Sequence, residues 1–428
     1  MGNISKFQLI VMAVFGVAIL AGTLVFSLNK GGSGDVVSDI SVWGYVTNNE
    51  FARLSKVSGL ADNDSLDISY TQKSPESFDV DFVNALADGV APDVVYIGQD
   101  SILAQSNRLI EIPYASYSQR DFQNNFADAS EVFLTPTGIR MLPLSIDPIV
   151  LYWNKRLFTD ANMTEPPKTW ASYTSQLVST FTKKDGQITI NQSALPFGTW
   201  DNLNAAKGIL SSLIFQGGGN ITDQTANGSV VSTLRSGGTT GVVPAEAALN
   251  FFVDFSNPQK NVYTWNRSLP NSLDYFASGQ SATYLGYASE VNTINAKNPN
   301  LSFDMAVIPQ GANNTKVTYA KMTGLALTKA SKNIPASVQV MYALSAEPAM
   351  AEYNAITSTA PTSRAMLGDP DRSNALTPVV YSSAIIARTW LEPNGQKTSS
   401  LFGDMVNSVV SGRKRVSEAV AKIGRAHV

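Results

Sequence analysis

The sequence predicts an α/β protein made of two lobes. Its 428 residues are enough for two cores of roughly 100 to 200 residues each. β-prone runs and helix-like segments alternate from Asp39 to Ile97, as a parallel, doubly wound sheet requires. The stretch from Leu142 to Trp170 then has the pattern of a segment that crosses from one lobe to the other.

A membrane segment is predicted at the N-terminus. Residues 7–28 carry no charge and are long enough to span a hydrocarbon core, which needs about 20 helical residues. We expect residues 1–6 to be cytoplasmic, 7–28 to form a transmembrane helix or uncleaved signal anchor, and 29–38 to be a linker. The alternative is a cleaved signal peptide; Thr23 stands where a lipoprotein signal would place its acceptor cysteine. The soluble part of this single-pass protein of the cell membrane would be extracellular or periplasmic.

The first elements of the soluble part alternate strand and helix. Asp39 to Trp43 and Ser65 to Tyr70 are β-prone, and Asn48 to Leu60 between them is helix-like. The next helix is predicted from Ser74 as its cap, with an apolar stripe at the fourfold spacing of Phe78, Phe82 and Leu86.

Ligands of such sheets bind beyond the carboxyl ends of the strands. The strand that ends at Trp43 is followed by Gly44 and Tyr45, and the strand from Val94 to Ile97 is followed by Gln99 and Asp100. We therefore expect Trp43, Gly44, Tyr45, Gln99 and Asp100 to point into one crevice.

The crossing stretch contains a charge between two apolar runs. Leu142 to Ser145 and Ile149 to Trp153 are predicted to be strands, and Asp147 interrupts them beside Pro148. A carboxylate in such a place needs a partner or a wet cleft. Asp147 is therefore predicted either to contact a ligand or to form an ion pair with a base such as Arg364.

The rest of the chain continues the α/β pattern. Glu165-Pro166-Pro167 forces an extended turn before a helix that Thr169 caps at Trp170. Later helices are predicted at 203–215, at 244–255, from Pro335 and from Pro348, and later strands at 282–285, 303–308 and 324–328. The C-terminal part is helical, with Trp390 in a turn-rich interruption.

Composition excludes several classes of function. The net charge of -3 gives no signature of polyanion binding, so nucleic acid is not an expected partner. The chain has no cysteine, and its sole histidine is His427. These two absences exclude thiolate chemistry, a Ser-His-Asp triad and Cys- or His-ligated metals in the body of the protein, and no cofactor is expected.

The terminal residues Ile423 to Val428 read Ile-Gly-Arg-Ala-His-Val, which one reading frame of a common sequencing-library adapter also encodes. We hypothesise that this segment, with the sole histidine, is not native. An unbroken run of native codons through His427 in genomic DNA would contradict this.

From about Ile40 onward the chain resembles the family 1 extracellular solute-binding proteins of ABC importers, the maltose-binding group. The resemblance is carried by short motifs in a fixed order, namely Val42-Trp43-Gly44, 89–95, Leu151-Tyr152-Trp153-Asn154-Lys155, 165–170, 276–282, 303–310 and 327–332. It implies a fold of the periplasmic-binding-protein type II class, with a ligand cleft between two α/β lobes. Lobe one would comprise 39–145 plus 309–357, and lobe two 146–308 plus 358–428.

The resemblance also implies roles for individual residues. Asp147 and Asp100 match cleft carboxylates that accept hydrogen bonds from sugar hydroxyls. Trp390 lies where relatives often present an aromatic ring to the sugar, and Tyr287 follows a glycine where many relatives have tryptophan. With Trp200 and Gly324, these residues complete the predicted ligand-binding set. The expected partners are a small solute of carbohydrate type and ABC permease subunits, and the protein is expected to be a monomer and not an enzyme.

The residue types suit a sugar cleft. Sugar rings stack an apolar face on aromatic rings and pair their hydroxyls with carboxylates and amides. Trp43, Trp153 and Trp170 sit in apolar runs that favour the core, whereas Trp200, Trp265 and Trp390 lie in polar, turn-rich surroundings. The alternative function is a secreted carbohydrate-active hydrolase, with Asp100 and Asp147 as acid and nucleophile or base.

Overall fold

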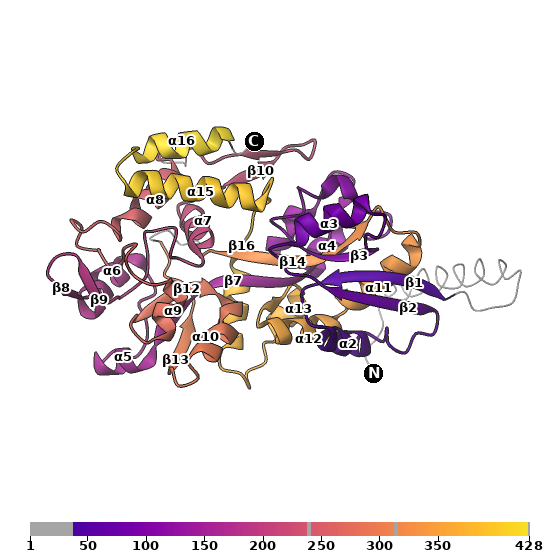
Figure 1. Cartoon of the computed structure of the whole chain (residues 1–428), viewed down its shortest axis with the longest axis horizontal. Coiled ribbons are helices and arrows are strands. Elements are labelled where there is room, and N and C mark those ends of the chain that lie inside the picture. Colours follow the sequence, from indigo (N-terminus) through magenta and orange to yellow (C-terminus); the bar gives the residue numbers. More distant parts are fainter. Residues whose placement is uncertain (1–36, 238–240, 312–315, 427–428) are drawn as a thin grey trace, which may run out of the picture.

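The computed structural model describes residues 37–237, 241–311 and 316–426 (Figure 1). The predictions for residues 1–36 and for His427 lie outside the described residues. Among the helices that are described, none is long and apolar enough to cross a membrane.

One large sheet organises the described chain, and three two-stranded sheets lie apart from it. The strands are β1 (Ser38–Gly44), β2 (Leu66–Gln72), β3 (Val94–Gly98), β4 (Leu109–Ile110), β5 (Ile112–Pro113), β6 (Gly138–Ile139), β7 (Leu142–Asn154), β8 (Lys183–Asp185), β9 (Thr189–Gln192), β10 (Thr222–Gln224), β11 (Val230–Ser232), β12 (Thr283–Tyr287), β13 (Phe303–Ala306), β14 (Thr318–Thr328), β15 (Ala360–Pro361) and β16 (Ala387–Arg388).

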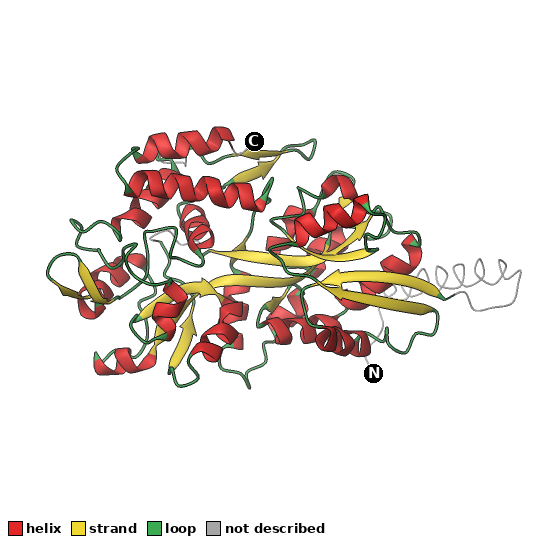
Figure 2. Cartoon of the chain, viewed as in Figure 1, coloured by secondary structure: helices red, strands yellow, loops and turns green. Residues whose placement is uncertain are grey.

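Helices cover the large sheet on both sides (Figure 2). They are α2 (Asn48–Val57), α3 (Phe78–Ala87), α4 (Gln119–Asn125), α5 (Lys155–Asp160), α6 (Trp170–Phe181), α7 (Ala206–Gln216), α8 (Pro244–Asp254), α9 (Ser272–Ala277), α10 (Val291–Lys297), α11 (Ile334–Ser345), α12 (Glu347–Thr357), α13 (Arg364–Gly368), α14 (Thr377–Ile385), α15 (Gly395–Val410) and α16 (Val416–Ala426), with 3-10 turns η1 (Ser106–Arg108), η2 (Asp128–Phe133) and η3 (Ala288–Glu290).

The large sheet is mixed, with the order β12-β7-β14-β3-β1-β2. β1 pairs in parallel with β2 and with β3, as the alternation of strands and helices in that part of the sequence predicts. β14, which is distant in sequence from β3 and β7, runs antiparallel to both of them. The predicted α/β class is confirmed, and the curled sheet is consistent with a two-lobe binding-protein fold.

The crossing segment is one strand, and the prediction of two strands separated by Asp147 is wrong. β7 runs unbroken from Leu142 to Asn154 because β14 pairs with it through Ile146, Asp147 and Pro148. Along its other edge, β15 pairs with β7 as far as Ile146 and β12 pairs from Ile149 onward. Pro148 lies at the gap between these two partners, and proline is tolerated in a strand where an edge is unpaired.

β7 contributes to two hydrophobic cores. Val150 and Tyr152 belong to one cluster, here called the first core, which also holds the β1, α2, α3 and β3 side chains. Ile149 and Leu151 belong to the other, the second core, built around α6, α7 and α8. Successive side chains of a strand point to opposite faces, so the alternation along one strand joins the two cores. In Figure 1, β7 and β14 run through the middle of the molecule between two groups of helices.

The first residues of α6 and α3 test the helix caps that the sequence predicts. Thr169 caps α6 at Trp170 as predicted, because its side chain accepts a hydrogen bond from the Ser172 N–H. α3 begins at Phe78 rather than at the predicted Ser74 cap. Ser74 instead bonds to Glu76 in a turn before the helix. The stripe is buried at Phe78 and Phe82, as its spacing predicts.

The lobe boundaries stay a prediction. α13 and α14 lie in the segment assigned to lobe two, 358–428, yet they bury Leu367, Val380 and Ala384 in the first core. The α15 and α16 helices further on pack with the second core through Phe402 and Val420.

Gly324 allows β7 and β14 to approach closely. A Cβ atom at this position would lie 2.5 Å from the Leu142 carbonyl oxygen and 3.0 Å from the Met141 sulfur. We expect Gly324→Ala to lower the free energy of unfolding by about 1–3 kcal/mol, because overpacking forces the backbones apart. Chemical denaturation measures the change. Gly368→Ala is the matched control, since nothing lies within 4 Å of the added methyl there; equal stability of the two variants would contradict the expectation.

Candidate ligand cleft

A cavity of about 540 Å³ opens between the two cores, and we call it the inter-core cavity. It is lined from one side by Tyr45 and Met322, which pack with the first core, and from the other by Trp200, Leu203 and Tyr287, which pack with the second. The first core also holds Phe276 of α9, Tyr284 of β12 and Ile294 of α10, so the two cores do not coincide with the two predicted lobes.

Five of the ten predicted ligand-binding residues line this cavity. They come from the loops after β1 and β3, from the loop before α7 and from the end of β12, and they are Tyr45, Gln99, Asp100, Trp200 and Tyr287. The first three lie beyond strand carboxyl ends, as the rule for ligand sites in such sheets expects, and their contact with a ligand stays a prediction.

The other five predicted residues do not line it. Trp43 is buried, with its ring edge against Phe82, and Gly44 packs under the Tyr70 ring. Gly324 is buried in the sheet. Trp390 is only 2% exposed and stacks on Phe402 in the second core, although it borders a different cavity of about 240 Å³.

Asp147, the fifth, is held by a neighbouring turn. Its two carboxylate oxygens accept hydrogen bonds from the Ser289 N–H at 3.0 Å and the Ser289 hydroxyl at 2.6 Å. Burial raises the pKa of Asp147, and the Ser289 bonds oppose that rise. The predicted ion pair with Arg364 is wrong, since Arg364 pairs with Asp128. Asp147 thus fastens β7 to η3.

Asp100 has a different environment. Its carboxylate accepts no hydrogen bond from any described residue, while its backbone carbonyl accepts one from the Gly395 N–H at 3.1 Å. The Asp100 side chain is partly buried and lines the cavity. Burial, and then the Asp100 charge, hold the pKa of the Tyr45 phenol well above its usual range. Asp100 therefore has free acceptor capacity for a ligand.

Gln99 is fixed rather than free. Its amide nitrogen donates to the Tyr319 hydroxyl at 2.9 Å, and its amide oxygen accepts from the Met322 N–H at 2.8 Å. These bonds tie the loop after β3 to β14. Gln99 thus positions the neighbouring Asp100.

Sequence reasoning missed a lysine at the cavity wall. Lys207 is the single charged residue of α7, and its ammonium donates to both oxygens of Glu392, at 2.9 and 2.7 Å. Glu392 is 0% exposed; burial raises the pKa of its carboxyl, and the Lys207 ammonium opposes that rise and favours the charged carboxylate. The sequence does contain one sign of this buried pair, because Lys207 is the only charged residue in the otherwise uncharged helix α7.

Three more charged residues at the cavity escaped prediction. Lys321 places its ammonium 4.1 Å from the centre of the Tyr287 ring. Glu76 and Asp79 come from the turn before α3 and from its first turn. Glu76 and Asp79 belong to a polar stretch that sequence alone cannot distinguish from a solvated surface, whereas Lys321 is the one charged residue of β14.

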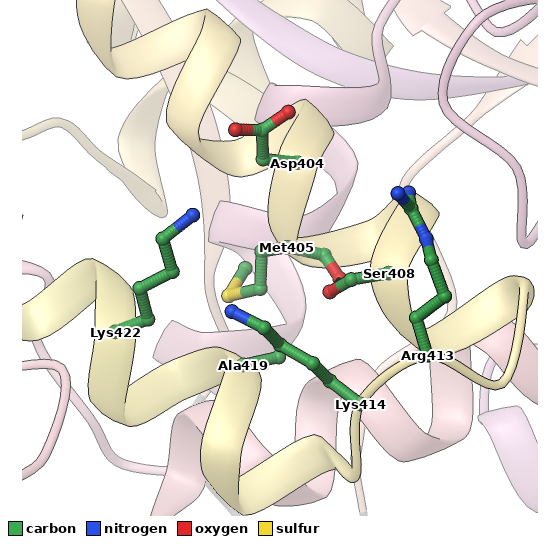
Figure 3. A pocket seen from close by; sticks show the side chains of 7 residues that line it. All are labelled: Asp404, Met405, Ser408, Arg413, Lys414, Ala419 and Lys422. Atoms are coloured by element: carbon green, nitrogen blue, oxygen red, sulfur yellow. Dashed lines mark hydrogen bonds between the residues drawn. The ribbon is translucent and has the colours of Figure 1, made fainter.

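A smaller cavity of about 160 Å³ lies between α15 and α16 (Figure 3). Asp404, Arg413, Lys414 and Lys422 surround it, together with Met405 and Ser408. It has no aromatic lining and belongs to the second core alone, so the inter-core cavity is the better candidate for a solute.

The described residues contain no group of three or more acidic or histidine side chains that could hold a metal ion. The carboxylates of the hydrolase alternative are also not together at one cavity. Asp100 lines the inter-core cavity, whereas both oxygens of Asp147 are engaged by Ser289.

Comparison with known proteins agrees with this geometry. Residues 20–375 match the model of a family described as bacterial extracellular solute-binding protein. No curated protein matches the chain.

Solved structures share the fold over nearly the whole chain. A cyclo/maltodextrin-binding protein complexed with maltotetraose is 16% identical, with a TM-score of 0.73 over 93% of this chain and 98% of its own. The sugar-binding protein MalE of Xanthomonas citri is 18% identical, with a TM-score of 0.72 over 91% and 96%. The GacH receptor of Streptomyces glaucescens, solved with acarbose, is 17% identical, with a TM-score of 0.68 over 91% and 97%.

Asp147 and Asp100 are expected to respond differently to truncation. Asp147→Ala leaves the Ser289 N–H and hydroxyl without their acceptor, so we expect a loss of about 1–3 kcal/mol in the free energy of unfolding. Asp100→Ala removes a carboxylate that accepts no hydrogen bond within the described part of the chain, and it should change stability by less than about 0.5 kcal/mol. Denaturation of the two empty variants tests this. If Asp147→Ala lost less stability than Asp100→Ala, the structural role assigned to Asp147 would be wrong.

A second carboxyl beside the crossing makes stability depend on pH. Burial raises the pKa of Glu290 from 4.5 to about 7, and Asp147 adds to the rise, although Glu290 accepts a 2.6 Å hydrogen bond from the Tyr284 hydroxyl. A carboxyl with a higher pKa in the folded state contributes fully below pH 4.5, and this contribution is lost as the pH rises through about 7.

We therefore expect Glu290→Gln to gain stability relative to the parent protein as the pH rises from about 5 to about 8, on the order of 1–3 kcal/mol. The Gln side chain can still accept the Tyr284 bond. Thermal denaturation across this range measures the gain. Glu165→Gln, at an exposed carboxylate, is the control, and the same pH dependence in both variants would refute the assignment.

Proposed function

Since its residues 20–375 match the family model, the chain belongs to the bacterial extracellular solute-binding proteins, and we propose that it captures a carbohydrate and delivers it to an ABC permease. The single observation that supports a sugar is the inter-core cavity itself, with aromatic side chains on both walls and Asp100 open between them. Sugars need such a combination of ring faces and hydrogen-bond acceptors.

The volume of the cavity is appropriate for this class of ligand. Small-molecule sites are typically clefts of about 300–1,000 Å³, and the inter-core cavity has about 540 Å³. Maltotetraose and acarbose are the ligands named for two of the solved relatives, which have the same fold. An oligosaccharide of a few rings is therefore the first ligand class to test.

Capture would proceed by closure of the two lobes on the solute. A solute that contacts both Tyr45 and Trp200 binds better when the two walls are near each other, so it shifts an open-closed equilibrium toward the closed form. The lobes would follow the boundaries predicted from the sequence, 39–145 with 309–357 and 146–308 with 358–428. The remaining predictions complete the proposal: a monomer, held at the cell membrane by residues 7–28, with permease subunits as partners.

The hydrolase alternative has no supporting observation. Paired catalytic carboxylates must lie about 5 to 9.5 Å apart on either side of a scissile bond. Asp147 is engaged by Ser289 and does not line the cavity, so Asp100 has no carboxylate partner of the kind proposed.

Titration calorimetry with a panel of oligosaccharides tests the proposal. We expect at least one sugar to bind, and Trp200→Ala to weaken that binding about tenfold or more, because the variant loses a stacking platform. Trp200→Phe retains a ring and should lose less.

The melting temperature of each empty variant separates lost binding from lost folding. If no oligosaccharide or polyol raises the melting temperature of the parent protein, the sugar assignment is refuted. Hydrolysis of a bound sugar would instead support the alternative function, a carbohydrate-active hydrolase.

A further inference from the structure

The charges that face the inter-core cavity do not balance. Five ionisable side chains with formal charge line it, namely Glu76, Asp79, Asp100, Lys207 and Lys321. Lys207 is neutralised from behind by the buried carboxylate of Glu392. Three carboxylates then remain against the single cation Lys321, so the wall as a whole attracts positive charge.

The excess charge is concentrated on the first-core wall. Among the described residues, neither Asp79 nor Asp100 has a cation within 4.0 Å. The Asp79 oxygens accept from two neutral donors, the Ser101 hydroxyl at 3.1 Å and the Gln105 amide at 2.8 Å. The Asp100 carboxylate accepts no hydrogen bond from any described residue. Within the described part of the chain, these two charges therefore have no counter-ion within 4.0 Å.

Lys321 does not reach across to compensate them. Its ammonium lies over the Tyr287 ring, whose packing belongs to the second core. A lysine that rests on an aromatic face gains cation-π stabilisation there. The Ser74 hydrogen bond and, less strongly, the Lys321 charge lower the pKa of Glu76. Lys321 is therefore engaged by Tyr287 and Glu76, and among the described ion pairs it makes none with Asp79 or Asp100.

An aromatic ring accompanies the two carboxylates. Tyr45 lines the same wall, and both Asp100 and Asp79 act on its phenol strongly enough to raise its pKa, after the larger effect of burial. An ammonium group is bound well by carboxylates together with a ring face, because the first supplies charge-assisted hydrogen bonds and the second a negative quadrupole. A neutral hydroxyl would use only the acceptor capacity and leave the charge unpaired.

We propose that the solute is an amino sugar, a saccharide whose protonated amine binds between Asp100, Asp79 and Tyr45 while its ring stacks on Trp200. This inference rests on the proposed function, since it takes the inter-core cavity as the sugar site. It adds that the solute is cationic.

A matched pair of ligands tests the charge alone. Calorimetry compares the disaccharide of glucosamine with its fully N-acetylated counterpart, at a pH at which the free amine is protonated. We expect the amine form to bind at least about tenfold more tightly, and its affinity to fall as salt is raised while that of the acetylated form changes little. This comparison uses the parent protein, so it does not depend on the folding of a variant.

The variant Asp100→Asn tests whether the charge of Asp100 causes the preference, because asparagine keeps the shape of the side chain and removes its charge. We expect the ratio of the two affinities, amine form over acetylated form, to fall toward one, because only the amine form uses the negative charge of the carboxylate. Asp404→Asn makes the same change beside the remote cavity between α15 and α16 and should leave the preference intact.

The outcomes separate this inference from the proposed function. Equal or tighter binding of the acetylated or a neutral disaccharide overturns the amino-sugar inference and leaves the sugar receptor standing. An unchanged preference in Asp100→Asn also overturns it, as does tighter binding of a simple diamine that has no sugar ring. Failure of every charged and neutral sugar to bind overturns both.

Discussion

The pairing of β7 with β14 is the interaction on which the rest of the structure depends. These two strands pair from Leu142 to Pro148, and further along β7 the side chains of its opposite faces belong to the first and to the second core. The backbones approach so closely at Gly324 that a methyl group would not fit. Two bodies joined by continuous strands can bend relative to each other without losing their register, which a receptor that closes on its solute requires.

The polar groups near this crossing are satisfied by local partners. Asp147 is bound by Ser289, and the Tyr284 hydroxyl donates to Glu290 just beyond it. A buried carboxylate without partners would cost several kcal/mol, so the turn after β12 is built around these two acids. The stability of the fold at this crossing therefore depends on pH, and Asp147 and Glu290 have structural roles there. By contrast, the Asp100 carboxylate accepts no hydrogen bond from any described residue, and that difference separates a structural aspartate from one that is available to a ligand.

The positions of some residues could be predicted from the sequence, and those of others could not. Tyr45, Gln99 and Asp100 could be placed at the cavity because strand order and the position of strand ends follow from local patterns. Trp265 and Trp390 could not: polar neighbours in sequence suggested exposure, but the folded chain buries both rings. Lys207 and Glu392 are 185 positions apart, and no local pattern predicts that they meet. Burial and ion pairing are decided by contacts between distant segments, and sequence spacing carries no information about those contacts.

The sequence by itself determined the α/β class, the caps of helices such as α6, the family resemblance and the loops that follow β1 and β3. These depend on hydrophobic period, on turn residues and on local hydrogen bonds, all of which act over a few residues. Only the tertiary structure decided that β7 is one strand, that Asp147 is engaged by Ser289, and that Asp100 and Asp79 share a wall on which neither forms an ion pair with a described residue. Those outcomes depend on which segments β14 and η3 bring alongside, and therefore on packing across the whole chain.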